Sequence, residues 1–233
     1  MKKFFIIAVM SLMSMGAFAQ LEPGTFSIQP KVGSTISWLS NMPSISSKYV
    51  EIDSSPTVGF LIGAEAEYQL AEKFSLAAGL NYAQQGSGWD DYTLSYTLDS
   101  QKNEFELKDA KVQLDYLNVP LVANYYLFKG FAVKAGVQFG FLLSAKQKGT
   151  MKVKVGDFTT TSYLEDHSDN FKDECSSVDI SIPLGISYQF NIPIVVDVRY
   201  NLGLTKVNKE SVSGQKDMKN NVIQLTLGYK FSL

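Results

Sequence analysis

Apolar and polar residues alternate one by one in eight segments of this 233-residue chain. The segments are Thr25–Trp38, Thr57–Leu70, Phe74–Gln85, Leu117–Leu127, Phe131–Ser144, Val178–Phe190, Ile194–Thr205 and Val222–Leu233. Alternation of this length predicts antiparallel β-strands with one apolar and one polar face. Eight such strands can close on themselves. We therefore expect an all-β fold, an eight-stranded antiparallel β-barrel.

The composition of the polar faces decides which face is outside. A soluble lipid-carrier barrel also alternates, with its apolar face turned inward, so alternation alone leaves both orientations open. Here the polar faces consist mainly of Gly, Ser, Thr, Asn and Gln, with one or two charges per strand. A water-facing sheet normally carries more Lys and Glu, whereas a narrow lumen suits small polar side chains. We expect a transmembrane barrel with the apolar face toward lipid.

Aromatic residues on the apolar faces gather at the two ends of the segments. One group lies near the short connections and comprises Phe26, Tyr68, Phe74, Tyr125, Phe131, Tyr188, Phe190, Tyr229 and Phe231. A second group lies near the other end and comprises Trp38, Tyr82 and Phe141. Aromatic girdles at both interfaces are typical of outer-membrane barrels.

The connections alternate in length, which indicates the orientation of the barrel. Three are tight turns, at Ala71–Lys73, Phe128–Gly130 and Asn191–Pro193. Four are long, at 39–56, 86–116, 145–177 and 206–221. Outer-membrane barrels have short periplasmic turns and long extracellular loops. With an even number of strands, both ends of the barrel domain then lie on the periplasmic side.

The first residues read as a secretory signal peptide. Lys2 and Lys3 form a basic start, Phe4–Met15 is apolar, and Ala17-Phe18-Ala19 is a small-x-small cleavage site. We expect residues 1–19 to be removed and residues 20–233 to form the barrel domain in the cell outer membrane. No later run of 18 or more apolar residues occurs, so helical membrane spans are not expected.

Charge and cysteine content exclude other classes. Loss of Lys2 and Lys3 reduces the 21 basic residues to 19, against 23 acidic residues, so the expected mature net charge is −4. This composition lacks the basic footprint of a nucleic-acid-binding protein. A single cysteine, Cys175, allows no intramolecular disulfide.

The pattern is irregular at a few points. Leu114 and Tyr116 differ in phase from Leu117 and the apolar residues after it, which predicts a β-bulge near Tyr116–Leu117. Three prolines stand inside predicted strands, where each removes a ladder hydrogen bond, and we expect bulges or local kinks there. They are Pro30, Pro120 and Pro183.

The charged residues of the polar faces are the candidate site. They are Lys31, Glu65, Glu67, Lys134, Asp179, Asp197, Arg199 and Lys230. All but Asp179 fall at similar depth, which predicts a salt-bridged layer in the lower lumen. Neighbouring strands suggest Lys31 with Glu65, and Asp197 or Arg199 with Lys230. Buried membrane charges can form an ion or proton path, but mixed signs that neutralise one another favour a structural plug and a closed pore.

The long loops contain weaker candidates. His167 is the sole histidine, and some outer-membrane barrel enzymes modify lipid with a His–Ser–acid set. His167 lies in a loop without rigid support, so we expect no enzymatic activity and no catalytic residue. Nearby carboxylates could bind calcium weakly, but they lack an EF-hand pattern, so we expect no metal or cofactor. They are Asp157, Glu165, Asp166, Asp169, Asp173 and Glu174. We interpret Cys175 as a lone loop thiol.

Several stretches resemble a known family. Asp115–Tyr126 (DYLNVPLVANYY) resembles a recurring strand of PorT-like outer-membrane β-barrel proteins of Bacteroidetes, which include OmpX-like small barrels. Ala135–Lys146, Val196–Thr205 and the ending Leu227–Phe231 add to this resemblance. The resemblance implies the barrel fold, and it raises a role in outer-membrane protein export without a motif that carries that role.

The long loops are therefore the expected location of the function. Runs within Asp91–Asp115 look like strands that project as a hairpin beyond the bilayer, and a free edge can pair with a partner strand. We hold two hypotheses for a monomeric barrel surrounded by outer-membrane lipid. In the first, the barrel displays loops 86–116 and 145–177 for partner binding, adhesion or envelope maintenance. In the second, it is an accessory subunit of a PorT-like export machinery.

Overall fold

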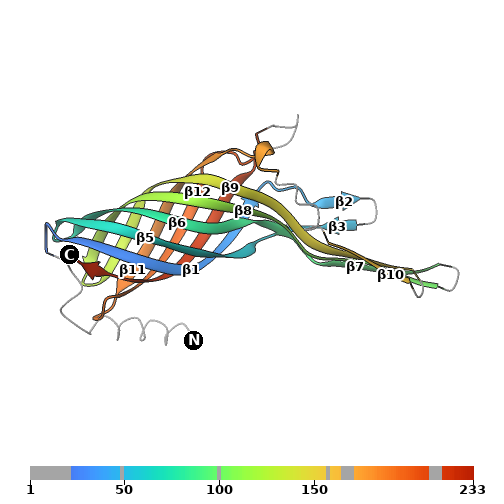
Figure 1. Ribbon diagram of the computed structural model, residues 1–233, viewed down its shortest axis with the longest axis horizontal. Helices are drawn as coiled ribbons and strands as arrows, with labels where there is room; N and C mark the ends of the chain where they lie inside the picture. Colours follow the sequence, from blue (N-terminus) through green and yellow to red (C-terminus); the bar gives the residue numbers. More distant parts are fainter. Residues whose placement is uncertain (1–21, 48–49, 99–100, 156–157, 164–170, 210–216) are drawn as a thin grey trace.

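The barrel is a closed ring of eight long antiparallel strands (Figure 1). The computed structural model describes residues 22–47, 50–98, 101–155, 158–163, 171–209 and 217–233. The ring strands are β1 (Phe26–Ser40), β5 (Thr57–Ala71), β6 (Phe74–Trp89), β8 (Gln101–Phe128), β9 (Phe131–Val155), β11 (Val178–Gln189), β12 (Ile194–Gly203) and β13 (Lys219–Tyr229). The ring closes where β1 pairs with β13, from Lys31 opposite Gly228 to Ser40 opposite Lys219. The predicted fold class is confirmed.

Shorter elements decorate this ring. Two strands, β2 (Ile45–Ser47) and β3 (Val50–Ile52), form a separate hairpin after β1. Strand β4 (Ser54–Ser55) pairs with β6, and β14 (Phe231–Ser232) pairs with β1. A short 3₁₀ helix, η2 (Phe171–Glu174), precedes β11. The described residues contain no helix long and apolar enough to cross a membrane.

The burial of the ring strands is inverted relative to a soluble protein. Along β1, the polar Ser27, Gln29 and Lys31 are buried in the lumen, while Ile28 and Val32 are exposed. The other ring strands repeat the pattern. The exposed apolar side chains include Val58, Phe60, Ile62, Leu76, Leu80, Leu121, Phe141, Leu143, Leu184, Ile186, Val198, Ile223, Leu225 and Leu227. An exterior of this kind is stable only in lipid.

Aromatic pairs mark both rims of the apolar exterior, as predicted. At the short-turn end, Phe128 stacks on Phe131 with ring centroids 4.9 Å apart. At the other end, Phe60 and Tyr82 lie 5.4 Å apart. Between these rims, the outward side chains are aliphatic or small.

The first and last described residues lie where the short turns are. These turns occupy residues 72–73, 129–130 and 190–193 between paired strands, and Gly130 provides a left-handed backbone conformation (φ 79°) in one of them. The Leu233 amide donates to the Phe26 carbonyl oxygen over 2.9 Å, so the carboxyl terminus closes against the start of β1. Residues 1–19, the predicted signal peptide, lie outside the described residues.

At the opposite end, a four-stranded sheet extends far beyond the ring. The long strands β8 and β9 stay paired up to Asn103 opposite Val155. They are flanked by β7 (Tyr92–Leu98), which pairs with β8, and by β10 (Phe158–Tyr163), which pairs with β9. We call this four-stranded extension the blade; it projects well past the barrel mouth (Figure 1). The expected projecting hairpin is confirmed, and connection 145–177 contributes the other two strands of the blade.

A register shift lies at the predicted position near Tyr116–Leu117, but β8 does not change phase there. Leu114 and Tyr116 keep the inward phase of the lumen-facing Asn118, and all three are buried. A register shift does lie here, but its extra residue, Leu143, belongs to β9. Strand β8 therefore does not change phase. Its apolar residues change sides, because the wall above this point meets water instead of lipid.

The three prolines interrupt the ladder without shifting it. Pairing of β6 with β8 lapses beside Pro120 and resumes in the same register. Pairing of β9 with β11 does the same beside Pro183. Pro30 lies where the pairing of β1 passes from β13 to β14. The predicted bulges are absent at these positions, because a missing N–H removes one bond but leaves the pleat intact.

Candidate functional site

The lower lumen holds a compact layer of ion pairs centred on Arg199. Its guanidinium donates two parallel hydrogen bonds to Glu65, of 2.6 Å (Nη1 to Oε1) and 2.7 Å (Nη2 to Oε2). It also contacts Asp197, through Nη2 to Oδ2 at 2.9 Å and Nε to Oδ1 at 2.8 Å. Lys31 Nζ lies 2.5 Å from Glu65 Oε1, and Lys134 Nζ lies 2.5 Å from Asp197 Oδ2. All five side chains are buried, so we name them the Arg199 layer.

A second group lies nearer the short-turn end and is centred on Glu67. Its carboxylate accepts hydrogen bonds from Ser75 Oγ (2.6 Å), Tyr126 OH (2.5 Å) and Lys230 Nζ (2.8 Å). Asn124 Nδ2 in turn donates to Ser75 Oγ over 3.0 Å. A buried carboxylate with three donors is well compensated for its loss of hydration.

Glycines opposite Glu65 and Arg199 make this packing possible. Gly79 lies opposite Glu65 in the β5–β6 ladder, and a Cβ there would come within 2.6 Å of the Glu65 Cγ. Gly185 lies opposite Arg199 in the β11–β12 ladder, and its Cβ would meet the Arg199 Cγ at 2.8 Å. Large charged side chains therefore fit into the lumen because the residues opposite them are glycines, which have no side chain.

The structure brings together seven of the eight predicted lumen residues. The predicted Lys31–Glu65 pair is confirmed. The predicted pairing of Lys230 with Asp197 or Arg199 is wrong, since Lys230 binds Glu67. The β12–β13 register sets Thr226 and Gln224 opposite Asp197 and Arg199. Lys230 follows the end of β13 and reaches past β1 to Glu67 on β5.

Asp179 stands apart, as expected from its position in the sequence. Its Oδ1 accepts a hydrogen bond from Thr205 Oγ1 over 2.6 Å, nearer the mouth of the barrel. Sequence reasoning missed Tyr126 and Ser75 as partners of Glu67. Both have lumen parity, so the alternation alone could have identified them.

The arrangement fills the lower lumen with charges that pair with one another. The Arg199 layer draws its members from β1, β5, β9 and β12, and its Arg199–Glu65 pair spans the lumen between β12 and β5, which are separated by β13 and β1 in the ring. Both of its carboxylates contact two basic groups each. Neither carboxylate therefore has an open side within the layer for a substrate or a metal ion.

The predicted loop candidates are only partly within the described structure. His167, Glu165, Asp166 and Asp169, together with Asp157, lie outside it. Asp173 and Glu174 lie on η2. Within the described ranges, no group of three or more His, Cys, Asp and Glu residues could hold a metal ion.

Cys175 is a free cysteine, but it is buried rather than exposed in a loop. It belongs to an apolar cluster inside the barrel mouth, with Leu39, Leu114, Tyr116, Leu142, Ala145 and Val207. Burial raises the pKa of the Cys175 thiol, and the Glu174 carboxylate acts in the same direction. A cavity of about 240 Å³ adjoins this cluster.

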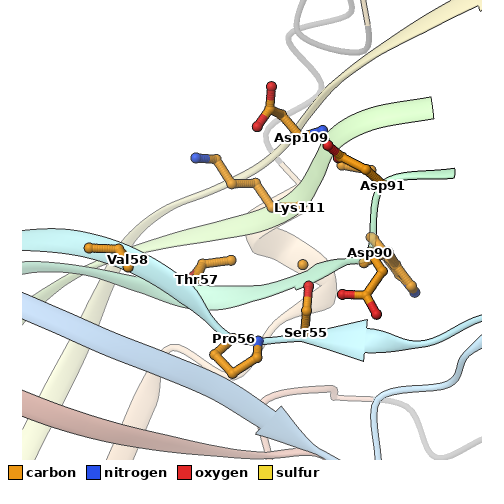
Figure 2. Close-up of a pocket in the computed structure, with 11 residues that line it drawn as sticks. Ser55, Pro56, Thr57, Val58, Asp90, Asp91, Asp109 and Lys111 are labelled. Carbon is orange, nitrogen blue, oxygen red and sulfur yellow. Dashed lines mark hydrogen bonds between the residues drawn. The ribbon is translucent and has the colours of Figure 1, made fainter. Parts of the chain in front are cut away.

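A polar hollow on the outside of the wall was not predicted. It has a volume of about 400 Å³ and lies where β4, β5, β6 and β8 meet, above the apolar exterior. Ser55, Thr57, Asp90, Asp91 and Lys111 are among its lining residues (Figure 2). The alternating lysines of the nearby β9 segment were the sequence signal for a charged surface here.

A closed barrel with an apolar exterior, aromatic rims and a polar, filled lumen is a transmembrane β-barrel. The chain belongs to the family described as outer membrane protein beta-barrel domain, which matches residues 18–209. Its location is therefore the outer membrane, with the short turns periplasmic and the blade extracellular.

Solved structures with a similar fold include three small outer-membrane proteins. Ail, the attachment invasion locus protein of Yersinia pestis, is 13% identical, with 90% of this chain and 99% of that chain covered and a TM-score of 0.43. Neisserial surface protein A is 13% identical (88% and 97% covered, TM-score 0.41). OprG from Pseudomonas aeruginosa is 15% identical (90% and 97% covered, TM-score 0.35). No curated protein matches the chain.

Proposed function

We propose that this protein is a small, closed, non-enzymatic outer-membrane barrel that displays the blade to bind a partner polypeptide outside the cell. The observation that carries the proposal is the blade itself, a four-stranded sheet held on a barrel with a filled lumen. The barrel supplies a membrane anchor and a rigid base, and the recognition surface lies on the blade. Binding of this kind suits adhesion or envelope maintenance.

The blade has two different faces. One face carries cross-strand pairs of opposite charge, with Glu104 opposite Lys154 and Glu106 opposite Lys152. The other face is apolar. Its base packs under Ile52 of β3 and beside Trp89, but its outer part is open, and Phe158 is 84% exposed. An open apolar sheet face above the membrane is a typical protein interaction surface.

The two edges of the blade also favour recognition of an extended chain. Among the described residues, strands β7 and β10 end the sheet, so each has one side without a paired strand there. Neither Tyr92–Leu98 nor Phe158–Tyr163 contains a charged residue or a proline, and these are the usual protections of an edge strand. A partner strand can add to such an edge through backbone hydrogen bonds.

Photo-cross-linking in intact cells, followed by purification in detergent, tests the proposal. A photoreactive residue at Thr160 is expected to trap a partner polypeptide. Val155→Lys with Phe158→Lys, on the apolar face, should abolish the adduct. Thr159→Lys with Thr161→Lys, of the same charge on the opposite face, should retain it. Heat-modifiable migration on a gel shows that each variant is folded. A wild-type protein without any adduct, purified as a clean monomer, would contradict the proposal.

The export hypothesis makes a different prediction in the same experiment. The stretches that resemble PorT-like proteins lie in the barrel wall, on β8, β9, β12 and β13–β14. They therefore concern the barrel and not the blade. An accessory export subunit should co-purify with secretion components, and this association should survive the Val155→Lys and Phe158→Lys changes.

A further inference from the structure

A cavity of about 240 Å³, which we call the mouth cavity, lies beside the apolar cluster around Leu114 and Cys175. It is surrounded by residues of three long connections and by the mouth ends of β6 and β8. Of the described residues that line it, ten are apolar and two, Glu174 and Asn208, are polar. Voids larger than a water molecule are few in a protein interior. A space of this size therefore requires walls that are held in place.

Hydrogen bonds between the surrounding connections hold these walls. The Ser176 amide donates to the Val207 carbonyl oxygen (2.7 Å), and the Val207 amide donates to the Met218 carbonyl oxygen (2.8 Å). Cys175 forms an isolated β-bridge with Asn208. The Asn208 side chain also accepts a hydrogen bond from the Met218 amide, over 3.2 Å to Oδ1. The mouth cavity is therefore preformed, as binding sites for small molecules usually are.

Trp89 adds an aromatic side chain to the wall from β6. Its indole Nε1 donates to the Pro43 carbonyl oxygen over 3.1 Å, so the polar atom of this side chain is satisfied within the protein. Met42 and Met218 also line the cavity. Methionine side chains are flexible and polarisable, and they make favourable contacts with aromatic rings. The lining therefore suits an apolar ligand, and an aromatic one in particular.

The same lining disfavours water and anions. A buried water needs about two to four polar partners, whereas a cavity of about 150 Å³ lined by aliphatic and aromatic side chains stays dry and binds benzene. The mouth cavity, of about 240 Å³, has room for a second fused ring. The carboxylate of Glu174, at the lining, repels a negatively charged ligand.

The filled lumen determines how a ligand enters and leaves. Leu114 and Tyr116 are fully buried at the mouth, and the Arg199 layer fills the lumen nearer the short turns. The mouth cavity lies among the long connections, at the extracellular end of the barrel. A ligand therefore exchanges with the medium outside the cell and is held in the mouth rather than passed through the barrel.

We propose that the mouth cavity binds one small, uncharged, apolar molecule, of the size of two fused aromatic rings, from the medium outside the cell. The cavity lies inside the barrel mouth and not on the open face of the blade. The proposal is therefore independent of partner binding by the blade.

Fluorescence quenching by 1-bromonaphthalene tests this site, because Trp89 lines the cavity and the chain has two tryptophans. The full mature protein is used in detergent. In the Trp38→Phe variant, the emission of Trp89 should fall and then saturate as the quencher is added. The Trp89→Phe variant retains Trp38, which stacks on Tyr200 in the outer aromatic rim with ring centroids 6.0 Å apart. Trp38 reports quencher dissolved in the micelle, so its quenching should not saturate.

Two further variants, made in the Trp38→Phe background, place the ligand. Val112 lines the mouth cavity, so Val112→Phe fills part of it and should weaken saturable quenching about tenfold or more. Val153→Phe is the matched control, with the same change on the apolar face of the blade, and it should stay within about twofold. The anionic analogue 4-bromo-1-naphthoate should bind at least about tenfold more weakly than 1-bromonaphthalene, because it meets the Glu174 carboxylate.

Protection of Cys175 is a second measurement, and it needs no substitution, since the thiol lines the same cavity. Naphthalene at ten times its dissociation constant should slow maleimide labelling of the wild-type protein about tenfold. Heat-modifiable migration on a gel shows that each variant is folded.

Four outcomes would overturn the proposal. Quenching of Trp89 with the same concentration dependence as Trp38 would show partition into the micelle only. Equal affinities of the Val112→Phe and Val153→Phe variants would place the quencher outside the cavity. Equal binding of the naphthoate would show that the site does not select uncharged molecules. An unchanged rate of Cys175 labelling would show that naphthalene does not occupy the cavity.

Discussion

Leu114 and Leu121 lie seven residues apart on one continuous strand and face opposite sides of the same wall. Leu114 is fully buried in the apolar cluster inside the barrel mouth, whereas Leu121 is 44% exposed on the lipid face. Between them, the apolar residues of β8 change from the lumen-facing side to the lipid-facing side, although successive residues keep their alternating orientation. The position of this exchange marks the outer boundary of the membrane.

The boundary predicts opposite responses to one substitution. Leu121→Arg places a charge near the middle of the lipid face and should cost about 2–4 kcal/mol of unfolding free energy. Val153→Arg makes the same type of change on the blade, in water, and should stay within about 0.5 kcal/mol of wild type. Urea titration of vesicle-reconstituted protein, followed by tryptophan fluorescence, measures both. Similar costs at the two positions would place the boundary elsewhere.

The Arg199 layer predicts an asymmetry between its two central residues. Its five members are three bases and two acids. Glu65→Gln leaves three bases with one acid and should cost about 3–5 kcal/mol, as expected when a buried pair is broken. Arg199→Gln leaves two bases with two acids, as the pairs Lys31–Glu65 and Lys134–Asp197. Its cost should be about 1–3 kcal/mol, since hydrogen bonds are lost without a charge imbalance.

The same urea titration measures these two variants. The double variant Glu65→Gln/Arg199→Gln is the control for additivity, and it should cost less than the sum of the single changes. If Arg199→Gln proves the more destabilising of the two, the charge balance of the layer does not govern its stability.

The strand pattern predicted the barrel because the side that a residue faces, lipid or lumen, depends only on its position in the alternation along its own strand. Phe60 and Glu65 take their sides from parity alone. The Lys31–Glu65 pair was also predictable, since β1 and β5 are neighbours and the two residues are close in register. The partner of Lys230 was not, because its side chain passes the neighbouring strand β1 to reach Glu67 on β5, and the shear of the barrel decides which residues of non-adjacent strands share a level.

In the blade, the alternation of apolar and polar residues does not by itself show which face is outside; the surrounding medium, lipid or water, must also be known. The apolar Leu107 and Met151 lie on the face continuous with the lumen, and the charged Glu106 and Lys152 lie on the face continuous with the lipid side. In a membrane-spanning wall this pattern would have the wrong phase, because it places charged residues on the outer face and apolar residues on the inner face. Above the membrane the outer face meets water, and there the same pattern is the expected one.

The filled lumen predicts that the barrel does not conduct ions. The Arg199 layer spans four strands, and buried Gln and Asn side chains occupy adjacent levels. Planar-bilayer recording of the wild-type protein should show no channel steps. Replacing all five members of the layer, Lys31, Glu65, Lys134, Asp197 and Arg199, by alanine should introduce measurable conductance. Reproducible large steps with wild-type protein would contradict the plug and revive an ion path.

Cys175 predicts a slow thiol whose reactivity reports on the barrel mouth. Because burial and the Glu174 carboxylate raise its pKa, less thiolate is present at neutral pH than in a free cysteine, and the thiolate is the reactive form. Maleimide labelling at pH 7 should be at least about tenfold slower than in urea-unfolded protein, and it should accelerate as the pH rises toward the pKa. A matched control is Thr161→Cys in a Cys175→Ala background, on the exposed strand β10; it should label rapidly in the folded state. Equal labelling rates at the two positions would show that the apolar cluster around Leu114 and Cys175 is open to water.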